Sequence, residues 1–291
     1  MKKKIKESNF RMRSRSERIA LNAITIFFSI WGATLIFPFV WGFINSLKTV
    51  REFNESQFSL PAVMQWENYI KALSVEVDHV PLLETVWNSI WLTFASIPFG
   101  IFFGSLAPYI IAKYKFRLNG FFFGLVILMS TLPLMGGTAA TYELLTQTFP
   151  IANNPFLWWI TWTGSLSGSF LIRYAAFKNV SWNYAEAAFI DGASHFSVFI
   201  RIMLPLIKPL LTAQVIMSCV SCWHDYMTSY MYMTDYPTLG LAIYMLSSDA
   251  SRIGVPIYLS LVLVSCVPSI GIFCIFQDHI MKNMTMGGLK G

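Results

Sequence analysis

Long stretches without a charged residue decide what this chain can fold into. Five such runs cover residues 19–47, 85–112, 118–142, 144–172 and 253–277. A sixth run, 202–224, is interrupted only by Lys208, which can reach the lipid headgroups because it lies near one end of the run. Each run exceeds the ~20 residues that an α-helix needs to cross a bilayer. The sequence therefore predicts an all-α membrane protein with six transmembrane helices.

Composition supports the same fold class. Hydrophobic residues make up 55% of the 291 residues and charged residues only 12%, whereas a soluble domain is about one quarter charged. The first apolar run is too long for a signal peptide and lacks a small-residue cleavage site, so it is predicted to stay as the first span. One membrane domain accounts for the chain.

The basic residues predict the orientation in the membrane. Seventeen of the 21 fall in 1–18, 113–117, 173–208 and the C-terminal tail. The remaining four lie in the intervening loops. Since lysine and arginine collect in cytoplasmic loops, both termini and 173–208 are expected in the cytoplasm, and 48–84 outside. The net charge of +6 therefore reflects membrane orientation and gives no sign of nucleic-acid binding.

The sequence contains few residues in arrangements that would support catalysis. No lysine follows a glycine, so the chain lacks the phosphate-binding loop of ATPases, and any ATPase must be another polypeptide. His224 and Asp225 form the only close acid–base pair near a span, and no nucleophile or metal-ligand spacing accompanies them. We expect a non-enzymatic chain without its own cofactor. The four cysteines lie in apolar runs and are predicted to be packing residues: Cys219, Cys222, Cys266 and Cys274.

A polar segment, residues 181–205, separates two of the apolar runs, and we call it the elbow. It reads as a short helix, a turn and a second helix. Ser181 can cap the first helix, Gly192 can end it in the left-handed conformation, and Ser194 can cap the second. An ordinary amphipathic cytoplasmic loop is the alternative interpretation.

The spacing within the elbow resembles the EAA loop of bacterial binding-protein-dependent ABC importer permeases. Glu186-Ala187-Ala188 is followed after three residues by Gly192, and after nine more by Ile202-x-Leu204-Pro205. This resemblance implies a cytoplasmic coupling helix between spans four and five, which sits in a cleft of a separate ATPase subunit. The residues that it assigns to coupling are Glu186, Ala187, Ala188, Asp191, Gly192, Ile202, Leu204 and Pro205.

Both ends of the chain extend the resemblance. Residues 36–48 are similar to the end of the first span in carbohydrate importers, and 284–291 are similar to the tail of the shorter permease subunit of the maltose-type transporter. The chain would then divide into a basic arm (1–18), a permease domain (19–283) and a cytoplasmic tail (284–291). The tail residues that would contact the ATPases are Thr285, Gly287, Gly288 and Lys290.

The resemblance also implies partners, a location and a mechanism. The expected partners are a second permease, two ATPase subunits that hold ATP and Mg²⁺, and a solute-binding protein above the acidic loop 48–84, which delivers a sugar. The second permease is expected to be a longer paralogue, and a second copy of this chain is the alternative. The location is the bacterial cell membrane, and the mechanism is alternating access. Three features depart from the usual pattern: His224 replaces an asparagine, Ser181 replaces a proline, and Pro133 with Gly136 and Gly137 interrupts the third span.

The outer end of the fifth span leaves two interpretations open. Trp223 is 18 residues beyond Pro205, or ~27 Å along a helix, which places it near the outer membrane surface. An aromatic belt would face lipid, whereas an outer gate or pathway would face the partner permease. An acid at this depth favours the gate. If the helix continues, Trp223, Tyr226 and Tyr230 share one face, since they are three and four residues apart. The possible gate or pathway group consists of Trp223, Asp225, Tyr226 and Tyr230.

An ion-coupled secondary transporter is the alternative function. Such carriers often contain inverted repeats with paired broken helices. Here one span is broken and the two halves show no clear similarity, and a carrier of this kind would not need the elbow.

Three G-x-x-x-G spacings predict close helix contacts, at Gly100–Gly104, Gly120–Gly124 and Gly164–Gly168.

Overall fold

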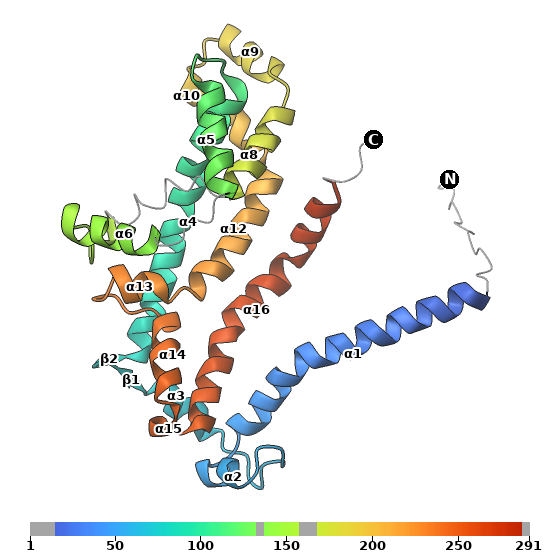
Figure 1. Ribbon diagram of the computed structural model, residues 1–291, viewed down its shortest axis with the longest axis vertical. Helices are drawn as coiled ribbons and strands as arrows, with labels where there is room; N and C mark the ends of the chain where they lie inside the picture. The colour runs from blue at the N-terminus through green and yellow to red at the C-terminus, as the bar shows by residue number, and fades with distance from the viewer. Residues whose placement is uncertain (1–14, 132–136, 157–167, 287–291) are drawn as a thin grey trace.

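The computed structural model describes residues 15–131, 137–156 and 168–286 and is built almost entirely of helices (Figure 1). Three helices of 32 residues each form its long axes. At ~1.5 Å per residue they are longer than a bilayer core, and their interior prolines are tolerated as they are in membrane helices. These helices are α1 (Arg15–Ser46), α4 (Leu82–Lys113) and α16 (Val255–Met286).

The bundle is formed by α4 and α16 together with two shorter helices, α8 (Gly168–Asn179) and α12 (Lys208–Trp223). Helix α8 packs on α4, and α12 packs on both α4 and α16. Helix α1 touches α16 near its C-terminal end and then diverges from the bundle (Figure 1). No residue in its most apolar 18-residue window is buried within the chain. An apolar helix of this length is therefore left uncovered.

One end of the molecule carries a compact cap of short elements (Figure 1). Residues 76–81 form a two-stranded antiparallel hairpin in which Val77 pairs with Val80, a small exception to the all-α prediction. Asn68 donates hydrogen bonds to the carbonyl oxygens of Ser46 (2.7 Å) and Lys48 (2.8 Å), which ties the cap to the end of α1. The cap consists of α2 (Val50–Glu55), α3 (Glu67–Leu73), β1 (Glu76–Val77), β2 (Val80–Pro81), α14 (Leu239–Ser248) and α15 (Ala250–Ile253).

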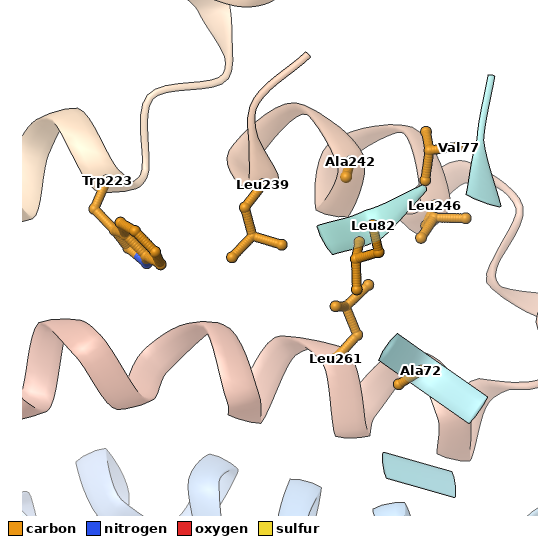
Figure 2. Packing of buried hydrophobic residues seen from close by; sticks show 8 residues of the cluster. All are labelled: Ala72, Val77, Leu82, Trp223, Leu239, Ala242, Leu246 and Leu261. Atoms are coloured by element: carbon orange, nitrogen blue, oxygen red, sulfur yellow. The ribbon is translucent and has the colours of Figure 1, made fainter. Parts of the chain in front are cut away.

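This arrangement is held by two large hydrophobic clusters and by a small one of Leu92, Tyr232 and Met233. The first lies at the cap and joins α3, α4, α12, α14 and α16 (Figure 2). The second lies at the opposite end, where the elbow packs on α4 and α8. The members of the second cluster are Tyr109, Phe177, Ala185, Val198, Phe199, Met203 and Ile207.

The predicted six spans are not all seen as single helices. Among the described residues, α1, α4 and α16 are long and apolar enough to cross a membrane. A fourth span results only if His195–Leu206 and α12, which meet at 78°, are counted together. This bend lies between Pro205 and Pro209, where the missing backbone N–H groups weaken helix continuity. The predicted run 202–224 is therefore divided at Ile207 into the helical end of the elbow and α12.

The predicted third and fourth spans lie partly outside the described residues. Within the third run, α5 (Asn119–Thr131) and α6 (Gly137–Glu143) are described, and α5 alone is shorter than a span. The fourth run starts with one π-helical segment, η1 (Leu144–Thr148), and then turns, with Asn153 at φ 56°. Residues 144–156 therefore do not begin a continuous helix.

Candidate functional site

The elbow has the helix–turn–helix structure that its sequence predicts. Its first helix, α9 (Asn183–Ile190), ends at Gly192, whose φ of 83° is left-handed. The N–H of Gly192 donates to the carbonyl of Phe189 (3.0 Å), and the N–H of Ala193 donates to that of Ala188 (2.9 Å). This pair of bonds is the Schellman arrangement that closes a helix C-terminus. The predicted role of Gly192 in the turn is confirmed.

The predicted caps are confirmed for one helix and shifted for the other. The hydroxyl of Ser194 accepts the N–H of Ser197 at 3.3 Å and caps α10 (His195–Val198). The hydroxyl of Ser181 accepts the N–H of Asn183, also at 3.3 Å, but the cap position itself is taken by Trp182, whose side chain makes no such bond. Beyond α10 the chain continues through η3 (Phe199–Met203) and α11 (Leu204–Leu206) to the bend at Ile207.

One face of the elbow is exposed and the other is buried against the bundle. Ala185 and Val198 are fully buried, whereas Glu186, Ala187, Asp191 and Gly192 are exposed. Ala188, Ile202 and Leu204 are half-buried, and Pro205 is exposed. Ile190, which sequence reasoning did not single out, is 86% exposed beside the turn. The sequence could have predicted this exposure, because Ile190 lies at the end of an amphipathic helix and outside its core-facing positions.

The C-terminal end of α4 is bonded directly to the elbow. The hydroxyl of Tyr114 lies 2.8 Å from Nδ1 of His195, and the amine of Lys113 donates to the carbonyl of Val180. The ring of Tyr114 also contacts Trp182. The elbow is thus mounted on the bundle from the end of α4 as well as from α8 and α12.

A cavity of about 600 Å³ lies between α4, α8 and α12 and reaches the end of α12. Its volume falls in the range of small-ligand sites. The hydroxyl of Ser96 on its wall is buried and has no hydrogen-bond partner within the described part of the chain. The cavity walls also carry two ionic groups, Arg173 and Asp225. Its further polar wall residues are Ser169, Gln214, Ser218, Ser221 and His224.

The outer end of the fifth span differs from the prediction. Helix α12 ends at Trp223, so the expected continuous face does not form. The Trp223 side chain is only 8% exposed, its ring points toward α16 (Figure 2), and its indole N–H donates to the carbonyl of Ser265 at 2.9 Å. Trp223 is therefore a core residue of the first cluster. It faces neither lipid nor a partner permease, so both interpretations are wrong for this residue.

The other three residues of that group remain near one another but do different things. Asp225 lines the cavity, and its carboxylate accepts both the N–H (3.2 Å) and the hydroxyl of Thr228 at the start of α13 (Met227–Tyr232). Tyr226 stacks on Tyr244 with ring centroids 4.4 Å apart. Tyr230 meets the same ring edge-on at 6.0 Å. Tyr244, on α14, was not anticipated from the sequence.

Several sequence expectations lie outside the described residues. These are the tail residues Gly287, Gly288 and Lys290, the interruption at Pro133 and Gly136, and Gly164; Thr285 is described only as backbone in the last turn of α16. Gly104 does approach α8 closely, whereas a Cβ on Gly120 or Gly124 would meet no atom within 4 Å.

No group of His, Cys, Asp and Glu able to hold a metal occurs in 15–131, 137–156 or 168–286.

The chain resembles characterised sugar-importer permeases over nearly its whole length. It is 24% identical to the diacetylchitobiose uptake system permease protein NgcG of Streptomyces coelicolor, with 90% of this chain and 86% of that protein covered. It is 25% identical to the melibiose/raffinose/stachyose import permease protein MelC of Bacillus subtilis, with 96% and 99% covered.

A solved structure shares the fold. A chain of a bacterial ABC transporter involved in the import of the acidic polysaccharide alginate superposes with a TM-score of 0.76 at 18% identity, covering 91% of this chain and 98% of that one. Residues 96–284 match the family model described as the binding-protein-dependent transport system inner membrane component. These residues include the elbow and every residue that lines the cavity. The chain therefore belongs to the family of binding-protein-dependent transport system inner membrane components.

Proposed function

We propose that this chain is a transmembrane permease subunit of an ATP-driven ABC importer for a sugar or oligosaccharide. The observation that carries the proposal is the elbow, a capped helix–turn–helix with an exposed acidic and apolar face at one end of the bundle. Its relatives NgcG and MelC carry names of sugar-uptake permeases, which supports a saccharide as the transported molecule.

The elbow is the site where a separate ATPase subunit docks. Glu186 and Asp191 offer carboxylates to basic residues, and Ile190 offers an apolar side chain that a cleft can cover. Closure of the ATPase dimer on ATP and Mg²⁺ displaces the elbow and opens the spans outward. Hydrolysis then resets the permease. The coupling set is Glu186, Ala187, Ala188, Asp191, Gly192, Ile202, Leu204 and Pro205.

The expected partner subunits would cover the surfaces that this chain leaves exposed. The unburied α1 provides an apolar helix for a second, longer permease, because a lipid bilayer or another helix must cover it. The cap lies at the end of the molecule opposite the elbow (Figure 1), which fits docking of a solute-binding protein on 48–84. Both termini and the elbow are cytoplasmic in this arrangement, and the tail from Thr285 to Gly291 reaches the ATPases.

The cavity between α4, α8 and α12 is this chain's part of the transport pathway. Ser96 carries a buried hydroxyl on its wall that has no hydrogen-bond partner among the described residues, and Asp225 retains further acceptor capacity beyond its two bonds to Thr228. Tyr226 and Tyr230, grouped around Tyr244, form the outer gate with Asp225. Trp223 supports this gate from the core, through its bond to Ser265 on α16.

Purification of the chain with its partners tests the proposal. The tagged chain should bring down a second permease and an ATPase subunit from the host membrane. In proteoliposomes, the sugar-loaded binding protein should raise the ATP hydrolysis rate, and uptake should require ATP on the elbow side. Uptake that follows an ion gradient in the absence of ATP would instead support a secondary transporter and refute the proposal.

A further inference from the structure

Arg173 is a buried cation at the meeting point of three helices. Its side chain belongs to α8 and is 6% exposed. Nε donates to Oε1 of Gln214 on α12 at 2.7 Å, and Nη1 donates to the carbonyl of Gly100 on α4 at 3.2 Å. The ion pairs seen among the described residues lie on the surface, and none involves Arg173. The two hydrogen bonds must therefore offset the cost of burying this charge.

The glycines of α4 leave room for the guanidinium. A Cβ at Gly104 would clash with Nη1 of Arg173. One turn away, Gly100 supplies the accepting carbonyl. The G-x-x-x-G spacing of α4 thus serves as a cradle for this side chain. The planar fork of arginine can reach two acceptors at once, which a lysine amine does not reproduce in the same geometry.

The hydrogen bonds of Arg173 join the helices that lie on either side of the elbow in the sequence. Helix α8 leads into the elbow and α12 leaves it, so the bond from Arg173 to Gln214 closes the base of the loop that contains the elbow. Arg173 and Gln214 also form part of the cavity wall. The same group therefore lies between the elbow and the cavity.

We propose that Arg173 is a positioning residue that makes α8, α12 and α4 move as one body when the elbow is displaced. The inference rests on the proposed docking of the ATPase at the elbow. With the bonds in place, a displacement of α9 reaches the cavity. Without them, α8 and α12 can slide past each other, and ATP is hydrolysed without movement of the pathway.

The test is the number of sugar molecules imported per ATP hydrolysed by the complete transporter in proteoliposomes. Arg173→Lys should lower this ratio about tenfold, the factor expected for one lost hydrogen bond to a charged group, and Arg173→Met, which loses both bonds, should lower it at least as much. Co-purification of the partners should not change. Lys178→Met is the matched control, because Lys178 is an exposed cation on the same helix, and its ratio should equal that of the wild type.

A swapped pair separates the mechanical role from a general loss of stability. Arg173→Gln combined with Gln214→Arg can restore a bond between α8 and α12 and should recover part of the ratio. Gly104→Ala, which pushes on Nη1, should lower the ratio without removing the charge. A wild-type ratio in Arg173→Met, or a changed sugar affinity at an unchanged ratio, would overturn the inference. If the wild-type complex shows no ATP-dependent uptake, the proposed function fails instead.

Discussion

At the scale of single residues, Gly192 offers a test of backbone conformation free of packing effects. Its φ is 83°, yet no atom lies within 4 Å of the position that a Cβ would occupy. Gly192→Ala should therefore add only backbone strain of about 1–2 kcal/mol, weaken the turn and reduce the coupling of ATP hydrolysis to transport. Gly120→Ala is the control, because that site is equally open and has no positive φ. Equal transport by both variants would contradict a role for the turn.

Trp223 gives a second prediction at this scale. Trp223→Phe removes the indole bond to Ser265 and should cost about 1 kcal/mol of stability, and Trp223→Ala should cost about 3 kcal/mol through the cavity that it leaves. Thermal unfolding of the purified protein in detergent measures both. Trp87→Phe, at a 62% exposed site on α4, should leave the unfolding temperature unchanged. Identical behaviour of the Trp223 and Trp87 variants would mean that Trp223 is not a core residue.

Sequence reasoning succeeded at residues whose role is local and failed where the partner is distant. Gly192 and Ser194 were predictable because a turn and a cap depend on neighbours within a few positions. Trp223 was not, because an aromatic residue near the membrane surface has the same pattern whether it faces lipid or α16. Arg173 was counted as a topology marker, since nothing in the sequence places it opposite Gln214.

At the scale of elements, α2 is held by a capping box with a pH dependence of known sign. Glu52 Oε2 accepts the N–H (2.9 Å) and hydroxyl (3.0 Å) of Thr49, and Oε1 accepts the N–H of Ala62 at 3.1 Å. The backbone bond from Thr49, followed by that from Ala62, lowers the pKa of Glu52 below its ordinary value of 4.5. The folded-state pKa is thus below the unfolded one, so the carboxylate stabilises α2 above pH 4.5 and loses this effect as pH falls through the folded value.

Hydrogen exchange measures this effect directly. The protection factors of the α2 amides should fall as the pH drops below about 4.5, and Glu52→Gln should flatten that dependence. Glu55→Gln is a suitable comparison, because Glu55 forms an exposed pair with Arg51 at 2.8 Å and does not cap the helix. Protection that is independent of pH in the wild type would argue against the capping role of the carboxylate.

The predicted helices were found where one apolar run is one element, as in α1, α4 and α16. The run 202–224 was misjudged, because hydropathy does not register the 78° bend between Pro205 and Pro209. The elbow could be predicted to within a residue, since its caps and glycine are local signals. The hairpin at 76–81 escaped prediction because its two-residue strands are too short to show an alternating pattern.

At the scale of the whole molecule, the two proposed docking surfaces lie at opposite ends of the bundle (Figure 1). The elbow forms one end, and the cap with 48–81 forms the other. Between them lie the cavity and the bonds of Arg173, while α1 extends away from the bundle with its apolar surface uncovered. A chain built in this way has separate places for an ATPase, a binding protein and a second permease.

Site-specific cross-linking in the assembled transporter tests the central claim, that the elbow docks on the ATPase. In a variant without the four native cysteines, Ile190→Cys at the exposed elbow should cross-link to the ATPase subunit in inside-out vesicles. Ser56→Cys, exposed at the opposite end, should not, and should react with an impermeant thiol reagent in intact cells. Reaction of Ile190→Cys with that reagent in intact cells, or ATPase cross-links from Ser56→Cys alone, would contradict the claim.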